Sequence, residues 1–263
     1  MQPTSLGPNM TGATLAPAAL AAMTQATDEL TPFDEIDTSE MESQKLAYID
    51  ESDAVGSIPV PTTLKGVAKS GLSKLQGKHP GVFLDKLGER LAYERTGVRL
   101  YDALILKYES AAQLDQGDVL PAVLLEGPDG QARSPETAEA LLHRIRGEEL
   151  EHFQLITQAI VKMGGDPTCM TPCADVTALA SSGFMQVLND PRTTLAQCLN
   201  AMLAVELADN AGWELLATLA DDMGEGDLAG QFLGALAQEQ EHLLIVKQWL
   251  TGLVVEDPKP AAV

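Results

Sequence analysis

"GEELEHFQLI" at residues 147–156 and "AQEQEHLLIV" at residues 237–246 follow one pattern. Each places a glutamate three residues before a histidine and then continues into an apolar run. The chain has 263 residues and only four histidines, so two of the four stand in the same short pattern. Residues three apart share one face of an α-helix, so each pattern predicts a helix with both side chains on one side.

Apolar residues recur at alternating steps of three and four around both motifs and in two further segments, which is typical of amphipathic helices. Aromatic residues make up only 4% of the chain, and Ala, Leu and Met dominate its second half, so we expect an all-α fold. The predicted helices cover residues 83–110, 134–163, 190–224 and 226–252. A loop at 115–132 joins the first two, and a long crossover at 165–190, with one short helix around 175–188, joins the second to the third.

Capping residues mark the expected helix ends. Ser134 followed by Pro135 predicts the start of the second helix, and Asp190 followed by Pro191 predicts the start of the third. The predicted stop signals are the glycines Gly164, Gly165 and Gly224.

Polar side chains interrupt the apolar stripe of every predicted helix. They are Glu94 on the first, Glu149 and His152 on the second, Glu206 and Asp209 on the third, and Glu239 and His242 on the fourth. At about 1.5 Å of rise per residue, Glu94 and Glu149 lie at similar heights above their connecting loop. Glu206 and Glu239 agree to within about one and a half turns. We therefore expect these groups to meet in one layer of the interior.

Such a layer needs positive charge. Ionised carboxylates in an apolar core cost several kcal/mol each unless they are paired or protonated. No lysine or arginine is expected on the stripes at this level, since Arg95 and Arg99 point elsewhere. Two divalent cations would balance the four glutamates, so the pattern favours a metal site. The alternative is a solvated charged face without a ligand.

The order of these motifs resembles the ligand pattern of the ferritin-like di-iron carboxylate proteins: one Glu, then Glu-x-x-His, then one Glu, then Glu-x-x-His. The rubrerythrin-like branch is the most similar, because Tyr101 lies seven residues after Glu94 and Asp209 lies three after Glu206. Rubrerythrins place a tyrosine and an additional carboxylate there. The resemblance covers roughly residues 83–252.

This resemblance implies a ferritin-like four-helix bundle with a long crossover between its second and third helices. It implies two Fe ions, with Mn or Zn as alternatives, and redox chemistry with dioxygen or peroxide. The implied metal ligands are Glu94, Glu149, His152, Glu206, Glu239 and His242. Tyr101 and Asp209 would be catalytic, or else a core tyrosine bonded to a carboxylate and a plain buried acid. No rubredoxin-like pair of Cys-x-x-Cys motifs is present, so electrons would come from an external donor.

Three functions stay open at this point. The first is a peroxide-reducing oxidoreductase of rubrerythrin type. The second is an iron-oxidising or iron-handling protein without a dedicated reductant. The third is a non-enzymatic helical module that binds a metal or a partner protein, and a homodimer is compatible with all three.

Composition limits the partners. A formal net charge of −21 excludes nucleic acid and anionic membrane surfaces as expected partners, because both need a basic footprint. No apolar stretch reaches the roughly 18 residues of a membrane span, so we expect a cytoplasmic protein. Residues 1–58 are acidic and predicted to be largely disordered, residues 59–82 form a basic linker or short helix, and residues 253–263 form a loose tail.

The remaining reactive or charged groups have simpler interpretations. Cys169 and Cys173 lie in the crossover, where they either form a reversible disulfide or are ordinary loop residues. Three glutamates next to the motifs fall off the stripes and are interpreted as surface charge: Glu148, Glu151 and Glu241.

Overall fold

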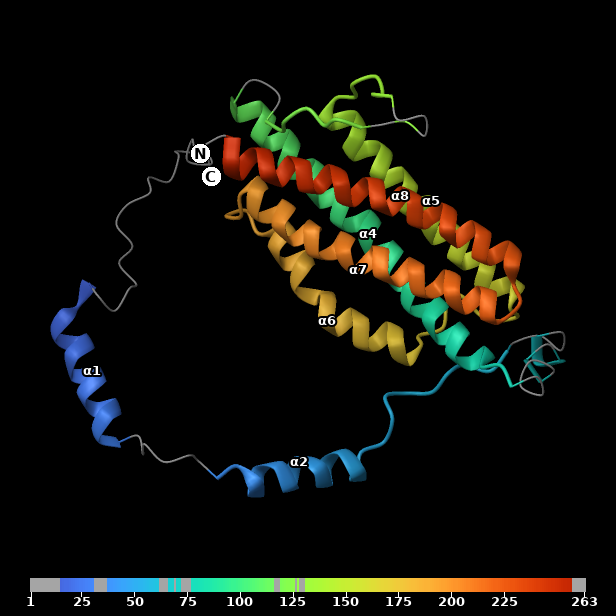
Figure 1. Ribbon diagram of the computed structural model, residues 1–263, viewed down its shortest axis with the longest axis horizontal. Coiled ribbons are helices and arrows are strands. Elements are labelled where there is room, and N and C mark those ends of the chain that lie inside the picture. Colours follow the sequence, from blue (N-terminus) through green and yellow to red (C-terminus); the bar gives the residue numbers. More distant parts are fainter. Residues whose placement is uncertain are drawn as a thin grey trace. The chain divides into compact units, whose positions relative to one another are not determined.

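A computed structural model describes residues 15–30, 37–61, 66–68, 70–71, 77–115, 119–125, 127 and 131–256. Within these ranges the regular elements are helices and no β-strand occurs, so the predicted all-α class is confirmed (Figure 1). The chain divides into two compact units, residues 1–54 and residues 55–263.

The first unit contains α1 (Pro17–Leu30) and α2 (Ser39–Glu51). Both helices lie inside the segment that was predicted to be largely disordered, and the prediction did not anticipate them. Neither helix buries a residue. Local propensity accounts for them, because α1 is rich in alanine and the Thr38 hydroxyl donates a hydrogen bond to Glu42 across the first turn of α2. Residues 1–14 and 31–36 lie outside the described part of the chain.

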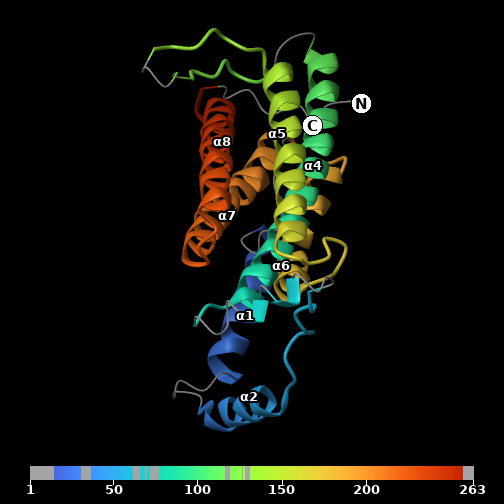
Figure 2. The same cartoon turned by 90° about the vertical axis from the view of Figure 1, so that its right-hand side faces the viewer.

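The second unit is built on five long α-helices. They are α4 (Pro80–Asp115), α5 (Ala138–Lys162), α6 (Pro172–Asn189), α7 (Leu195–Asp222) and α8 (Gly226–Thr251). The helix α4 packs along α5, α6 and α7, while α7 pairs with α8 and α5 approaches α8 (Figures 1 and 2). The crossover helix α6 therefore covers α4 and α7. A π-helical turn, η2 (Gly252–Glu256), follows α8 where a loose tail was predicted.

Several helix boundaries differ from the prediction. The first helix begins three residues earlier and ends five residues later than expected, at Pro80 and Asp115. The predicted N-cap Ser134 lies outside α5, whose N-cap is Thr137, because the Thr137 hydroxyl accepts from Ala140 N. Asp190 is the C-cap of α6 instead of the N-cap of the next helix. Thr194 opens α7 because it forms a reciprocal capping box with Gln197.

Two predicted stop signals are confirmed. Gly164 and Gly224 follow the ends of α5 and α7 with φ angles of 84° and 74°. These left-handed values are accessible to glycine at little cost, which ends both helices sharply.

The interior consists of two hydrophobic clusters with a polar layer between them. One cluster includes Leu100, Ile145, Met202 and Trp249, and the other includes Leu91, Ile156, Trp213 and Phe232. On α5, α7 and α8, the polar residues of the stripe lie between the members of the two clusters, and on α4 Glu94 lies between Leu91 and Leu100. The polar layer therefore lies at a similar height along all four helices.

None of the helices in the described part of the chain is long and apolar enough to cross a membrane.

We expect Thr137→Ala to lower the free energy of unfolding by about 1 kcal/mol, because it removes the N-cap of α5. Ser134→Ala should change it by less than about 0.5 kcal/mol, since Ser134 is exposed and precedes the helix. Urea unfolding of both variants provides the measurement. Equal losses would contradict the observed helix start.

Candidate metal centre

The structure buries all eight residues that the sequence analysis selected. Glu94, Glu149, His152, Glu206, Asp209, Glu239, His242 and Tyr101 are each 0 to 2% exposed. They come from α4, α5, α7 and α8, and each helix contributes two. A solvated charged face, the alternative interpretation of the motifs, is therefore wrong.

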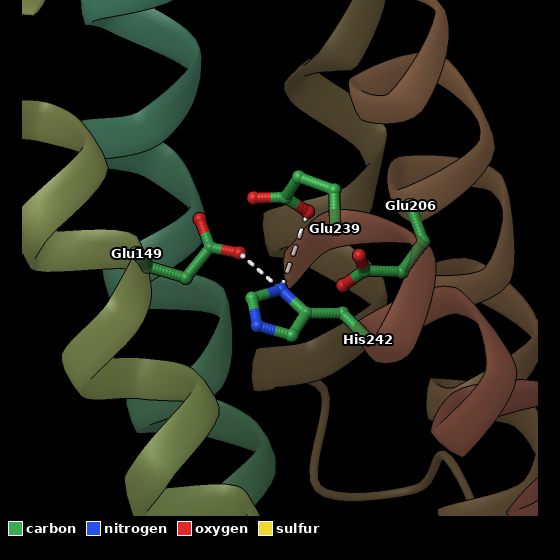
Figure 3. Close-up of side chains that lie close together, drawn as sticks. All are labelled: Glu149, Glu206, Glu239 and His242. Atoms are coloured by element: carbon green, nitrogen blue, oxygen red, sulfur yellow. Dashed lines mark hydrogen bonds and ion pairs between the residues drawn. The ribbon is translucent and has the colours of Figure 1, made fainter. Parts of the chain in front are cut away.

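The potential ligand atoms form overlapping groups. Glu149, Glu206, Glu239 and His242 offer atoms that all lie within 4.8 Å of one another (Figure 3). Glu94, His152 and Glu239 form a second such group. Glu239 belongs to both, and Glu149 also joins a third group with Glu94, Asp209 and Glu239. The six predicted ligands thus meet in one place, and their binding of a metal stays a prediction.

Both imidazoles turn Nδ1 towards the carboxylates. His152 Nδ1 lies 2.7 Å from Glu239 Oε1 and 3.7 Å from Glu94 Oε2. His242 Nδ1 lies 3.2 Å from Glu239 Oε2 and 3.5 Å from Glu149 Oε1 (Figure 3). A neutral imidazole that carries its proton on Nε2 would present a lone pair on Nδ1 to this cluster.

The Nε2 atoms have partners outside the cluster. His152 Nε2 lies 3.0 Å from Gln238 Oε1, and His242 Nε2 lies 2.7 Å from Glu148 Oε2. Such acceptors hold the proton on Nε2 and fix the ring orientation. The interpretation of Glu148 as surface charge is wrong, because its side chain is 17% exposed and bonds both His242 and Arg144. Glu151 is exposed as predicted, and Glu241 pairs with Arg133 and Arg144 near the surface.

Several buried atoms of the cluster are unsatisfied. Among the described residues, none provides a hydrogen bond of acceptable geometry to Glu94 Oε2, Glu149 Oε2, Glu206 Oε2, Glu239 Oε1 or His152 Nδ1. The 2.7 Å approach of His152 Nδ1 to Glu239 Oε1 is an ion pair when the imidazole is protonated. Buried polar atoms normally find partners. Carboxylate oxygens and imidazole nitrogens pointing at one another suit cations placed between them.

Arg90 is a residue that the sequence analysis missed. It is 6% exposed, and its Nη1 atom donates hydrogen bonds to Asp209 and, at 3.4 Å, to Glu94. The expectation that no basic side chain reaches this level is therefore wrong. Arg90 precedes Glu94 by one helical turn, so the i, i+4 spacing could have revealed it. Arg95 and Arg99 are exposed, as predicted.

The charges of the layer match two divalent cations. Five buried carboxylates, those of Glu94, Glu149, Glu206, Asp209 and Glu239, face the single buried guanidinium of Arg90. With neutral imidazoles and ionised acids, four negative charges remain. A pair of doubly charged cations would balance them.

When no metal is bound, protons on these side chains offset part of the negative charge of the layer. Burial raises the pKa of Glu149 to about 8, with a further contribution from Glu239. Burial also raises the pKa values of Glu206 and Asp209 well above their usual range. Burial alone would lower the pKa of His152, but Glu239 and Glu94 beside it raise that pKa to about 10.

Tyr101 contacts one of the potential ligands directly. Its hydroxyl donates a hydrogen bond to Glu206, and its ring lies edge-on to the His242 ring, 6.5 Å between centroids. Burial and the neighbouring carboxylate of Glu206 raise the pKa of Tyr101 well above its usual value. The phenol therefore stays protonated and acts as a hydrogen-bond donor.

No protein-family model matches the chain, and no curated protein matches it.

All three cysteines are free, and Cys173 lies in the first turn of α6.

We expect Gly97→Ala to weaken Co(II) binding at least about tenfold, or about 1.4 kcal/mol. A Cβ atom at position 97 would lie 2.1 Å from Glu149 Oε2 and 2.9 Å from its Cδ, so the buried carboxylate must move. Gly147→Ala is the control, because a Cβ there meets nothing within 4 Å. Unchanged affinity in the Gly97 variant, measured by titration, would remove Glu149 from the ligand set.

Metal binding should release protons. Coordination needs a neutral imidazole and ionised carboxylates, whereas His152, with a pKa of about 10, and Glu149, with a pKa of about 8, hold protons in metal-free protein at neutral pH. The apparent affinity for Co(II) should therefore rise from about pH 6 to about pH 8. Calorimetry in buffers of different ionisation enthalpy measures the protons released. Binding without proton release would contradict these protonation states.

Proposed function

We propose that this chain is a ferritin-like protein with a dinuclear non-haem iron centre and redox chemistry towards dioxygen or peroxide, similar to rubrerythrins. The observation that carries the proposal is the pair of overlapping ligand groups that share Glu239. The resemblance of the motif order supports the same conclusion. The fold is part of the proposal: a four-helix bundle of α4, α5, α7 and α8, with α6 in the crossover. The pairing of α4 with α5 and of α7 with α8 supports it.

The grouping suggests a division of the ligands. Glu94 and His152 would hold one ion, and Glu206 and His242 the other. Glu239, which belongs to both groups, would be shared, together with Glu149. Mixed carboxylate and imidazole ligands suit iron, and Mn or Zn are the alternatives.

Bound iron would supply the capacity to exchange electrons with dioxygen or peroxide. The chain's own residues perform the supporting steps. Glu148 and Gln238 orient the two imidazoles, and Tyr101 holds a proton on its hydroxyl next to Glu206. The two hydrophobic clusters exclude bulk water from the layer on either side. Electrons would come from an external donor.

An iron-oxidising protein is the second candidate. The net charge of −21 favours it, because a strongly acidic protein attracts cations. Anaerobic protein mixed with Fe(II) and then with oxygen or peroxide, with and without a chemical electron donor, separates the two functions. Turnover of peroxide that depends on the donor supports the rubrerythrin-like function. Oxidation of Fe(II) without peroxide turnover supports the alternative.

Metal content provides the direct test of the centre. Protein purified from iron-replete cells should contain two Fe ions per chain. Glu94→Ala and Glu206→Ala should each lower the content to about one, because each removes a ligand of one ion. Glu239→Ala should lower it further, because Glu239 belongs to both groups. Elemental analysis with folding checked by circular dichroism gives the answer.

Glu151→Ala is the matched control, since Glu151 is exposed and adjacent in sequence to His152. It should keep both ions. A wild-type content well below two, or equal contents in wild type and the Glu239 variant, would refute the dinuclear centre.

A further inference from the structure

Arg90 lies inside the candidate centre but is not one of the proposed ligands. Its side chain reaches from α4 to α7, where Nη1 donates to the carboxylate of Asp209. Glu94 Oε1 lies 3.4 Å from the same nitrogen. The side chains of all three residues are at most 7% exposed. Water therefore contributes little to their solvation.

The surroundings fix the guanidinium in place. Its Cζ atom lies 4.8 Å from the centre of the Tyr93 ring and 5.9 Å from that of the Trp213 ring. A Cβ atom at position 212 would lie 1.4 Å from Arg90 Nη2, so only glycine leaves room for the guanidinium there. Residues of both α4 and α7 thus build the position of Arg90.

Asp209 has two competing partners. Its carboxylate lies within 4.8 Å of potential ligand atoms of Glu94, Glu149 and Glu239, so it is close enough to join a metal site. A cation bound to Asp209 would compete with the buried guanidinium of Arg90 for the charge of the same carboxylate. A buried charge without a partner is strongly unfavourable. When Asp209 pairs with Arg90, four negative charges remain in the layer, and two divalent cations balance them.

We propose that Arg90 is a positioning residue that holds Asp209 as its counterion and keeps it out of the metal coordination sphere. The centre then has six protein ligands instead of seven. The inference rests on the proposed function. It differs from what the resemblance implies, in which the additional carboxylate takes part in the chemistry of the centre. With fewer protein ligands, more coordination positions stay available to a small exogenous ligand.

Co(II) is the probe, because its visible absorption reports coordination number and its titration gives stoichiometry. Asp209→Asn in the full chain is the first variant, since the amide oxygen can still accept the hydrogen bond from Arg90. We expect two Co(II) ions per chain and the spectrum of the wild type at saturation, with weaker affinity because Arg90 loses its counterion.

The second pair of variants removes the contact between Arg90 and Asp209 instead. Arg90→Met removes the guanidinium, and Gly212→Ala displaces it while both charges stay in the chain. Both should weaken the visible absorption as Asp209 becomes a ligand. The double variant Arg90→Met/Asp209→Asn should restore the wild-type spectrum. Gly234→Ala is the control for an added methyl group in a helix, because a Cβ there meets nothing within 4 Å.

The outcomes are separable. An altered spectrum in Asp209→Asn with both ions bound would show that Asp209 is a ligand and overturn the inference. Unchanged spectra in both Arg90→Met and Gly212→Ala would also overturn it. If Arg90→Met does not fold, Asp209→Asn and Gly212→Ala still decide. Wild-type protein that binds fewer than two Co(II) ions would instead overturn the proposed function, and the inference with it.

Discussion

Five carboxylates buried in one layer are the constraint on which the rest of this structure depends. Together they would be incompatible with a stable core if all were ionised and unpaired. The protein balances part of the charge with Arg90, and the rest falls to protons or to cations. The hydrophobic clusters on either side keep water away from the layer, so solvent cannot provide the balance. The same burial that makes the layer costly therefore makes it a strong site for a cation.

The two Glu-x-x-His motifs are linked more closely than their spacing implies. The residue before the glutamate of each motif contacts the histidine of the other: Glu148 contacts His242, and Gln238 contacts His152. Each repeat therefore consists of this contacting residue followed by Glu-x-x-His. The two repeats differ chemically, since the His242 imidazole has a carboxylate partner and the His152 imidazole has an amide partner. A carboxylate makes the imidazole a more basic ligand, so the two halves of the centre should differ in how tightly they hold a cation.

Much of the layer was predictable because helical periodicity alone selects which side chains point inward. All eight selected residues are buried, and the all-α class follows from the same pattern. Arg90 was missed because only Arg95 and Arg99 were considered, although its spacing from Glu94 places Arg90 on the same face. The contact of Glu148 with His242 could not be predicted, because it depends on the packing of α5 against α8. The cap positions were wrong for a local reason: at two helix starts, a threonine nearer the helix forms a better cap than the residue before the proline.

Two glycines inside the helices leave room for charged side chains of the polar layer. Glycine in a helix interior costs about 1 kcal/mol relative to alanine, so Gly97 in α4 and Gly212 in α7 weaken the helices that carry them. Each faces a charged group of the layer: Gly97 lies against Glu149, and Gly212 lies against Arg90. Alanine at either position would need the space that the charged group occupies. Helical stability is therefore given up where a buried charge on a neighbouring helix must approach closely, which is expected of helices adapted to hold a charged centre rather than to pack an apolar core.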